Sequence, residues 1–353
     1  MTTAISRRRF AAGLSALPLA ATFSASAQGT PEASPAVLEP VEIPPFEVPA
    51  DAQVVNIGFL PIMIYAPMYV ALEKGYYAER GLDVRTTPMN SGTDLAVMVS
   101  TNDLQVALSG IGPAFWNGLD TGLPLSIIAP GHEEGNPVAT PLMVGANSDI
   151  TSVDQLAGKK VAVNAPGATE YWLEAALQTG GLSIEDVELQ YLTFPDALIA
   201  LSTDALDAAM IGEPLATKAV QDGSARILSD DFDVAGVQVT AVFSNNDWVE
   251  GNADAAANFV AAYLQACRDL VDEPNDPLNL TIISKYTTVP MELIAESVRP
   301  TYQPNGEINI ENLVMLQEFF MGRELMAFDE AIDPTSVIRQ DVIDAAVEIV
   351  GAR

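Results

Sequence analysis

The sequence predicts an α/β protein with two similar lobes. A short apolar strand, a helix and a second strand follow one another twice along the chain, a pattern typical of parallel sheets. Parts of the two halves also match at a constant spacing of 102 residues. The chain has 353 residues, of which 49% are hydrophobic, so it has ample material for a buried core.

The first unit begins with a buried strand at residues 54–59, followed by a proline-containing loop at residues 60–65. A helix then runs from about Ala66 to Arg80, where Gly81 stops it, and a second strand covers residues 82–86. The second unit has the same order of elements. It comprises a strand at 160–163, a loop at 164–169, a helix from about Glu170 to Thr179 and a strand at 187–192.

The match between the two halves continues beyond these units. Residues 100–108 align with residues 202–210, and each copy then has a glycine (Gly110, Gly212) followed by a proline (Pro113, Pro214). Clusters of Ser, Thr and Asp are common at turns and could coincide by chance. Asp94 and Asp196, which head the preceding helices, share the same spacing, however, and this favours two homologous lobes in tandem.

The last third of the chain is mainly helical. A β-rich run at residues 237–244 precedes a helix whose apolar face extends from Phe259 to Val271. Further amphipathic helices are predicted at residues 291–298, 312–326 and 340–350. Cys267 lies on the apolar face of the first of these helices, so we interpret it as a core residue rather than a reactive thiol.

The N-terminus has the pattern of an export signal at residues 1–27. Arg7, Arg8 and Arg9 precede Phe10 and an apolar stretch, and residues 25–27 (ASA) offer a small-residue cleavage site. The arginines favour a signal of the twin-arginine type over an ordinary secretory signal, and both imply a periplasmic or cell-surface location. Whether the signal is cleaved or kept as an anchor stays open.

The segment at residues 28–52 contains six prolines and five acids, which predicts an extended acidic spacer before a globular part that begins near Gln53.

Charge and composition exclude several functions. The 47 acidic and 16 basic residues give a net charge of −31, which disfavours binding to nucleic acid. A single Cys excludes an intramolecular disulfide, and a single His excludes a multi-histidine metal site. We therefore expect no metal, no cofactor and no catalytic residues.

A ligand site is expected where the carboxyl ends of the strands face helix N-termini. The loops at these positions are 60–66, 89–94 and 109–113 in the first half, and 164–169, 193–196 and 211–214 in the second. The residues expected to contact a ligand are Leu60, Met63, Tyr65, Asn90, Ser91, Gly92, Thr93, Ser109, Gly110, Trp116, Gly167, Ala168, Thr169, Phe194, Gly212 and Glu213.

Several stretches resemble the extracytoplasmic solute-binding proteins of ABC importers, within the group that includes nitrate, sulfonate, taurine and thiamine-pyrimidine binders. The stretches that carry the resemblance are residues 71–77 (ALEKGYY), 80–84 (RGLDV), 90–93 (NSGT), 153–163 (VDQLAGKKVAV) and 211–214 (IGEP). The similarity covers roughly residues 54–244. These motifs are specific to the superfamily and not to any one ligand.

The resemblance implies an α/β fold of the type II periplasmic-binding-protein kind, with two lobes joined by a two-strand hinge. Lobe one would then comprise residues 53–143 and 244–353, and lobe two residues 144–243. It also implies that a monomer captures a small molecule between the lobes and delivers it to a membrane permease.

The side chains of the expected cleft loops favour an aromatic heterocycle, such as a thiamine pyrimidine precursor or riboflavin. None of the predicted cleft loops carries Lys or Arg. Glu213 can accept hydrogen bonds from an amine, although a solvated or hinge-side carboxylate is an equal interpretation. Tyr65, Trp116 and Phe194 could stack on a flat ring. The alternative is a sulfonate, taurine or nitrate held by helix N-termini and backbone amides.

An enzyme alternative also follows from the resemblance, because a thiamine-pyrimidine synthase has a related fold. The reaction of that family requires an internal histidine and a cysteine-rich iron-binding segment. This chain has only His132, within residues 131–135 (GHEEG), and no cysteine cluster. We expect the 131–135 segment to be a solvated loop, and binding without chemistry to be the function.

Overall fold

A computed structural model describes residues 38–89 and 92–353, except for the side chain of Thr93. The strands are β1 (Gln53–Phe59), β2 (Leu82–Pro88), β3 (Val106–Gly110), β4 (Leu125–Pro130), β5 (His132–Glu133), β6 (Leu142–Gly145), β7 (Lys160–Val163), β8 (Glu188–Tyr191), β9 (Ala208–Met210), β10 (Ala225–Ser229), β11 (Thr240–Asn245) and β12 (Thr301–Tyr302). The helices are α1 (Ala66–Glu73), α2 (Gly92–Ser100), α3 (Pro113–Asp120), α4 (Ala168–Gln178), α5 (Phe194–Ser202), α6 (Leu215–Gln221), α7 (Asn246–Gly251), α8 (Ala253–Asp272), α9 (Pro277–Thr287), α10 (Met291–Glu296), α11 (Ile310–Gly322) and α12 (Gln340–Val350).

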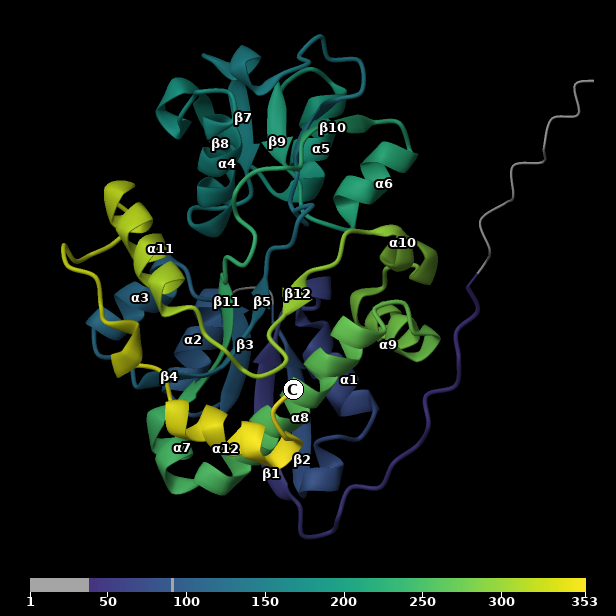
Figure 1. Cartoon of the computed structure of the whole chain (residues 1–353), viewed down its shortest axis with the longest axis vertical. Coiled ribbons are helices and arrows are strands. Elements are labelled where there is room, and N and C mark those ends of the chain that lie inside the picture. Colours follow the sequence, from purple (N-terminus) through teal and green to yellow (C-terminus); the bar gives the residue numbers. More distant parts are fainter. Residues whose placement is uncertain (1–37, 90–91) are drawn as a thin grey trace, which may run out of the picture. The chain divides into compact units, whose positions relative to one another are not determined.

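Two five-stranded sheets form the two lobes (Figure 1). The first has the strand order β2-β1-β3-β11-β4, and the second, taken from its opposite edge, has the order β8-β7-β9-β6-β10. In each sheet the first three strands are parallel and the fourth is antiparallel to its neighbours. The two lobes therefore share one topology, and the two-lobed α/β fold expected from the sequence is confirmed.

The fourth strand of each sheet comes from the chain after it has crossed from the other lobe. β6 pairs with β9 and β10, so Leu142 and Met143 belong to the second sheet rather than to the first. β11 pairs with β3 and β4, so residues 240–243 belong to the first sheet. Both crossings thus lie earlier than the expected boundaries at 144 and 244, because an apolar run does not reveal which sheet it joins.

The 102-residue spacing found in the sequence is also present in the backbone. The amide of Asp103 donates to the carbonyl of Met98 at 3.0 Å, and the amide of Ala205 donates to the carbonyl of Ala200 at 2.9 Å. Asn102 and Asp204 both adopt a left-handed conformation at the same turn, with φ of 60° and 55°. The two copies therefore leave their helices in the same way.

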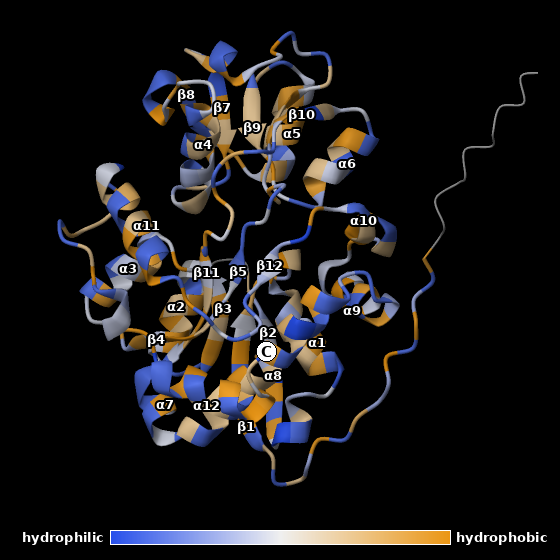
Figure 2. Cartoon of the chain, in the orientation of Figure 1, coloured by the Kyte–Doolittle hydropathy of each residue, from blue (hydrophilic) through white to orange (hydrophobic). Residues whose placement is uncertain are grey.

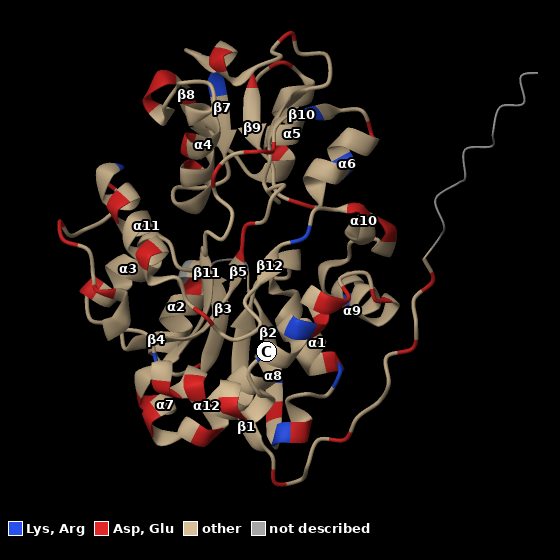
Figure 3. Ribbon diagram, in the orientation of Figure 1, with Lys and Arg blue, Asp and Glu red and all other residues tan. Residues whose placement is uncertain are grey.

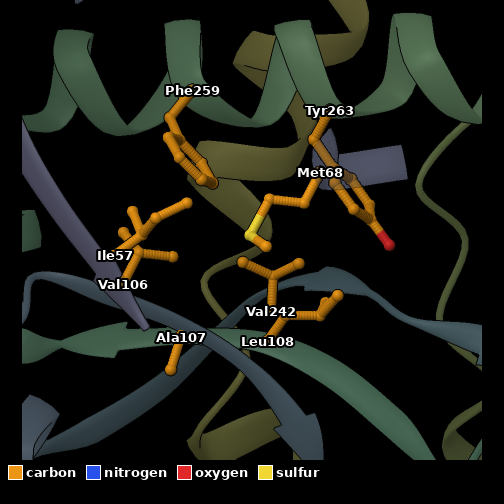
Figure 4. A pocket seen from close by; sticks show the side chains of 8 residues that line it. All are labelled: Ile57, Met68, Val106, Ala107, Leu108, Val242, Phe259 and Tyr263. Atoms are coloured by element: carbon orange, nitrogen blue, oxygen red, sulfur yellow. The ribbon is translucent and has the colours of Figure 1, made fainter. Parts of the chain in front are cut away.

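The core of lobe one lies between its sheet and α8. Strands at the centre of both sheets are apolar, as Figure 2 shows. Phe259 and Tyr263 of α8 reach down toward Met68 and the strands (Figure 4). The gap between these side chains has a volume of about 10 Å³, which suffices for at most one water molecule, so this space is a packing defect and not a ligand site. Cys267 is buried on the same helix, as expected.

Helix α1 ends earlier than the sequence predicted. Gly75 has φ of +75°, its amide donates to the carbonyl of Leu72, and the amide of Tyr76 donates to the carbonyl of Ala71. This is the left-handed glycine arrangement that closes a helix. Residues 78–80 form a separate 3-10 turn, so Gly81 ends that turn and not the helix.

The described part of the proline-rich segment is extended but does not stand away from lobe one. The amide of Leu38 donates to Glu292 of α10 at 2.8 Å, and the amide of Val41 donates to Thr281 of α9 at 3.1 Å. Leu38 and Ile43 also pack against the core of lobe one. The expected spacer is therefore bound to the domain from residue 38 onward, and the export signal at 1–27 lies outside the described residues.

Acidic residues are spread over the outer helices of both lobes (Figure 3). Within the described part of the chain, none of the helices is both long enough and apolar enough to cross a membrane.

Candidate functional site

A cavity of about 900 Å³ is lined by residues of both lobes and of the two segments that cross between them. These crossing segments are residues 131–141, between β4 and β6, and residues 230–239, between β10 and β11. This volume lies within the range of small-molecule sites. Lobe one contributes residues 60–65, 92, 96, 109, 110 and 112–115, and lobe two contributes 164–169, 172, 194 and 212–215. Thr240 and Phe243 of β11 also belong to lobe one, the crossing segments add residues 132, 134, 139, 140 and 239, and the C-terminal third adds residues 287, 289 and 300.

Most residues that the sequence suggested for ligand contact line this cavity. They are Leu60, Met63, Tyr65, Gly92, Ser109, Gly110, Gly167, Ala168, Thr169, Phe194, Gly212 and Glu213. Asn90 and Ser91 lie outside the described residues. Thr93 belongs to α2, but its side chain lies outside the description as well.

Trp116 does not line the cavity. Its side chain is fully buried in the core beside Phe115, with the ring centroids 5.4 Å apart. Both residues lie on α3, where neighbouring side chains are about 100° apart around the helix axis. Phe115 therefore faces the cavity while Trp116 faces the core. The aromatic side chain of α3 at the cavity is thus Phe115 and not Trp116.

Helices from both lobes begin at the cavity wall. The starts of α2, α3, α4, α5 and α6 all contribute lining residues. Gly167, at the N-cap of α4, has φ of +123°, and a Cβ there would lie 3.2 Å from Pro113 of lobe one. Glycine thus permits the two lobes to approach closely at this point. The first turns of α2, α4 and α5 carry Asp94, Glu170 and Asp196, which offset the positive ends of the helix dipoles.

Two aromatic rings, from Tyr65 and Phe194, contribute to the walls on opposite lobes. The Tyr65 hydroxyl is hydrogen-bonded to Ser109, and burial raises the pKa of Tyr65 well above its usual range, so it stays neutral. The Phe194 ring lies against Gly212, where a Cβ would come within 2.7 Å of the ring. Gly212 therefore makes room for this ring.

Glu213 lines the cavity and also holds the start of α6. One carboxylate oxygen accepts from the Thr217 amide at 3.0 Å, and the other accepts from the Thr217 hydroxyl at 2.8 Å. The second oxygen also accepts from the amide of Val298, in the C-terminal third, at 3.4 Å. Glu213 therefore has a structural role, and unfilled acceptor positions remain for a ligand.

The GHEEG segment at residues 131–135 is not the solvated loop that the sequence suggested. His132, Glu133 and Glu134 are 6%, 7% and 3% exposed. The segment crosses between the lobes, and residues 237–240 and 301–303, which cover it, are far away in the sequence. His132 and Glu134 line the cavity, and their only signal in the sequence was the unusual density of titratable groups.

Glu134 connects the crossing segment to lobe two. Its carboxylate accepts from the Trp172 indole at 2.8 Å, from the Ala139 amide at 2.8 Å and from the Thr140 hydroxyl at 3.4 Å. Burial raises the pKa of Glu134, and these hydrogen bonds partly oppose the rise. Trp172 itself lines the cavity, so this indole is both a wall and a partner of the carboxylate.

The ionisable lining is acidic. Among the described lining residues the charged side chains are Glu134 and Glu213, and none is Lys or Arg. In the described part of the chain no group of three or more His, Cys, Asp or Glu residues could hold a metal ion. The cavity therefore combines two carboxylates, a neutral imidazole and several aromatic rings.

The family model described as "NMT1/THI5 like" matches residues 63–276, which is more than half of the chain. The chain belongs to this family. The matched range includes the second sheet, all strands of the first sheet except β1, and most of the cavity lining, so the family assignment covers the candidate site itself.

Several curated relatives of this NMT1/THI5-like chain are binding proteins with different ligands in their names. The "Putative aliphatic sulfonates-binding protein" of Escherichia coli (strain K12) is 25% identical over 66% of this chain and 70% of its own. The riboflavin-binding protein of Chloroflexus aurantiacus is 26% identical over 64% of each. The formylaminopyrimidine-binding protein of Halalkalibacterium halodurans is 25% identical over 76% of this chain and 78% of its own.

Solved structures agree on the fold. The periplasmic aliphatic sulphonate binding protein of Escherichia coli aligns with a TM-score of 0.68 at 21% identity, covering 81% of this chain and 92% of its own. A desulfurization enzyme aligns with a TM-score of 0.62 at 15% identity, covering 84% and 99%. At these identities the likeness shows the fold alone, and the function has to be argued from the site.

Proposed function

We propose that this protein is the substrate-binding component of an ABC importer, which captures a small molecule between its lobes and delivers it to a membrane permease. The observation that carries the proposal is the 900 Å³ cavity, whose walls come from both lobes and from the segments between them. A ligand that contacts both lobes favours the arrangement in which they are close together. A permease can then distinguish the loaded protein by the surface that the two lobes form.

The ligand we propose is an uncharged or weakly cationic aromatic heterocycle, such as a thiamine pyrimidine precursor or riboflavin. Glu134 and Glu213 would repel an anion, and no described Lys or Arg of the lining would offset them. Tyr65, Phe194 and Trp172 line the cavity, and a flat ring that stacked on one of them would gain about 0.5–1.5 kcal/mol. Two of the relatives carry such ligands in their names.

The alternative is a sulfonate, taurine or nitrate ligand. The starts of five helices at the cavity wall support it, because their free amides attract anions. The acidic first-turn residues of α2, α4 and α5 weaken this attraction. We therefore rank this alternative second. A pyrimidine synthase-like activity is the less favoured alternative, since Cys267 is buried in the core and no cysteine cluster accompanies it.

The remaining parts of the proposal follow from the sequence. Export by a signal of the twin-arginine type would place the protein in the periplasm or at the cell surface, where a permease is accessible. We propose that it acts as a monomer without cofactor, and that the ligand contacts include Asn90, Ser91 and Thr93 in addition to the described lining residues.

A thermal-shift panel tests the function and the ligand class together. The purified protein is melted with riboflavin, 4-amino-5-hydroxymethyl-2-methylpyrimidine, taurine and nitrate. A ligand at 100 times its Kd adds about 2.7 kcal/mol to the free energy of unfolding and raises Tm. A rise with either heterocycle supports the proposal, and a rise with taurine or nitrate alone transfers it to the anion class. Turnover of the bound compound, followed by mass spectrometry, would contradict capture without chemistry.

The contribution of Glu213 has its own test. Glu213→Gln keeps the shape and one oxygen that can accept from the Thr217 amide, its NH2 group can donate to the Thr217 hydroxyl, and the charge is removed. We expect weaker binding of an amino-heterocycle, measured by titration calorimetry. Unchanged affinity would leave Glu213 with its structural role at the start of α6 only.

A further inference from the structure

The extended segment that crosses between the lobes places two polar side chains on one face of the cavity. β5 pairs antiparallel with β12, with His132 opposite Tyr302. Side chains alternate along an extended chain, so His132 and Glu134 point to one side and Glu133 to the other. Consistently, His132 and Glu134 line the cavity, whereas the Glu133 carboxylate accepts from the amide group of Gln303 at 2.8 Å.

The imidazole of His132 is held in a defined orientation by Thr240. The Thr240 hydroxyl oxygen lies 2.8 Å from the backbone amide of His132 and 2.8 Å from its ring Nδ1. The backbone amide can only donate, so the hydroxyl accepts that bond and has its own proton free for Nδ1. We assign to the neutral ring the tautomer that accepts the hydroxyl proton at Nδ1 and carries its own proton at Nε2. Among the described residues only Thr240 is hydrogen-bonded to this ring.

The ring is also uncharged, because burial lowers the pKa of His132 to about 4. At neutral pH it therefore offers one donor and no charge. Glu134 provides hydrogen-bond acceptors. Its two oxygens already accept three hydrogen bonds from the protein. A carboxylate has about four acceptor positions, and one of its oxygens accepts from Ala139 alone, so acceptor capacity remains.

We propose that His132 and Glu134 form a single recognition edge, which donates a hydrogen bond from His132 Nε2 and accepts one at the Glu134 carboxylate. This edge selects a planar uncharged heterocycle that presents an acceptor next to an N–H donor. The inference rests on the proposed function and deepens it, because it adds a polar part of ligand recognition on the crossing segment to the expected contribution of Glu213 in the cleft loops. Thr240 is a positioning residue in this scheme.

Two heterocycles carry this chemistry. The isoalloxazine ring of riboflavin presents a carbonyl next to an N–H, and 4-amino-5-hydroxymethyl-2-methylpyrimidine presents a ring nitrogen next to an amino group. Sulfonate and nitrate groups have acceptors but no donor, so the Glu134 side of the edge would repel them. The edge therefore discriminates between the ligand classes named for the relatives.

The test is titration calorimetry of both heterocycles against the full chain and three variants. His132→Phe keeps the ring shape but loses the donor, and we expect whichever heterocycle binds to do so about 10- to 100-fold more weakly. His132→Gln restores a donor near Nε2 and should recover most of the affinity. Glu133→Gln is the matched control: it changes the neighbouring buried carboxylate, which points away from the cavity, and should leave the affinity within twofold.

The outcomes separate this inference from the proposed function. If a heterocycle binds and His132→Phe binds it as tightly as the wild type, the recognition edge is overturned while the proposed function stands. If only taurine or nitrate binds, the recognition edge and the proposed heterocycle ligand are both overturned, while the proposed role as a substrate-binding component passes to the anion class.

Should His132→Phe fail to fold, the unaltered chain gives the answer with modified ligands. Methylation of the riboflavin ring N–H, or removal of the pyrimidine amino group, should weaken binding at least 10-fold. Equal binding of the modified ligand would overturn the edge.

Discussion

The two lobes have the same strand order but are stabilised differently. One face of the second sheet packs on α5 and α6 through a small cluster in which six of ten buried residues are alanines. Lobe one has larger side chains in its core, such as Tyr77, Phe259 and Tyr263, and is covered by the long helix α8. The difference teaches that the repeated unit specifies topology, while the size of the core side chains and the helices that cover them differ between the lobes.

A helix outside the repeat also contacts lobe two. Arg323, directly after α11, forms ion pairs with Glu170 of α4 at 2.9 Å and with Glu185 at 2.5 Å. Tyr171 of α4 packs edge-on against Phe319 of α11, with centroids 5.2 Å apart. The relation of the lobes in this structure therefore depends on a C-terminal segment that has no counterpart within the repeat.

Substitutions in the cores of the two lobes should have the largest effects on the free energy of unfolding. Phe259→Ala removes a buried ring stacked on Tyr77 in lobe one and should lower the free energy of unfolding by about 3–5 kcal/mol. Leu201→Ala in lobe two should cost about 2–4 kcal/mol. Denaturant unfolding measures both values. Hydrogen exchange then locates them: Leu201→Ala should accelerate exchange mainly in the second sheet, and equal acceleration in both sheets would mean that the cluster around Leu201 is not a separate unit of stability.

The next largest loss of stability is expected when the ion pair between Arg323 and Glu170, which links the lobes, is removed. Arg323→Ala leaves the Glu170 carboxylate, which is fully buried, with the Tyr191 hydroxyl at 2.7 Å as its remaining partner. An uncompensated buried charge is costly, and because Arg323 itself is 23% exposed we expect a loss of about 2–3 kcal/mol. Urea unfolding gives the value. Arg339→Ala breaks an exposed pair with Asp341 and serves as the control, with a loss below about 1 kcal/mol.

A double variant checks the cause of that loss. Glu170→Gln removes the charge that Arg323 compensates, so adding it to Arg323→Ala should restore part of the stability. A double variant no more stable than Arg323→Ala alone would attribute the effect to the packing of the arginine stem.

The topology could be predicted from the sequence because the repeat makes the same strand, turn and helix signals occur twice. The cavity lining could be predicted in large part for the same reason, since loops after parallel strands gather at one edge of a sheet. His132 and Glu134 could not, because a run of polar residues indicates solvent exposure unless the segments that cover it are known. Those segments, at 237–240 and 301–303, are more than 100 residues away.

The same limit explains two smaller errors. Trp116 and Phe115 are equally aromatic, and only the orientation of α3 in the fold decides which one faces the cavity. The end of α1 at Glu73 depends on the left-handed conformation of Gly75, over which Phe46 of the N-terminal segment packs. Contacts between distant segments, and not local propensity, settled both cases.

Because His132 lies buried in the crossing segment, we expect the free energy of unfolding to depend on pH. The pKa of His132 is lowered from 6.5 to about 4, so its contribution to stability is complete above pH 6.5 and is lost as the pH falls toward 4. At pH 5 the loss is about 2 kcal/mol. Burial raises the pKa of Glu133 and Glu134, and these groups act in the opposite direction on acidification.

The difference between the wild type and His132→Gln isolates the histidine. Urea unfolding between pH 4 and pH 7 should show that the variant loses less stability on acidification than the wild type. Parallel pH profiles for the two proteins would mean that His132 is protonated as easily in the folded state as in the unfolded chain.

The smallest effect tests the repeat itself. Asn102 and Asp204 occupy the same turn in the two lobes with φ of 60° and 55°, a conformation that glycine adopts without strain. Asn102→Gly and Asp204→Gly should each change the free energy of unfolding by less than about 1 kcal/mol, and Ala at either position should cost about 1 kcal/mol more than Gly. The Gly-to-Ala difference removes side-chain contacts from the comparison and leaves the backbone. Equal differences in the two lobes would mean that the turn is strained to the same extent in both copies. A difference confined to lobe one would mean that lobe two relaxes around the turn at Asp204. The shared topology of the two lobes would then not imply equal rigidity.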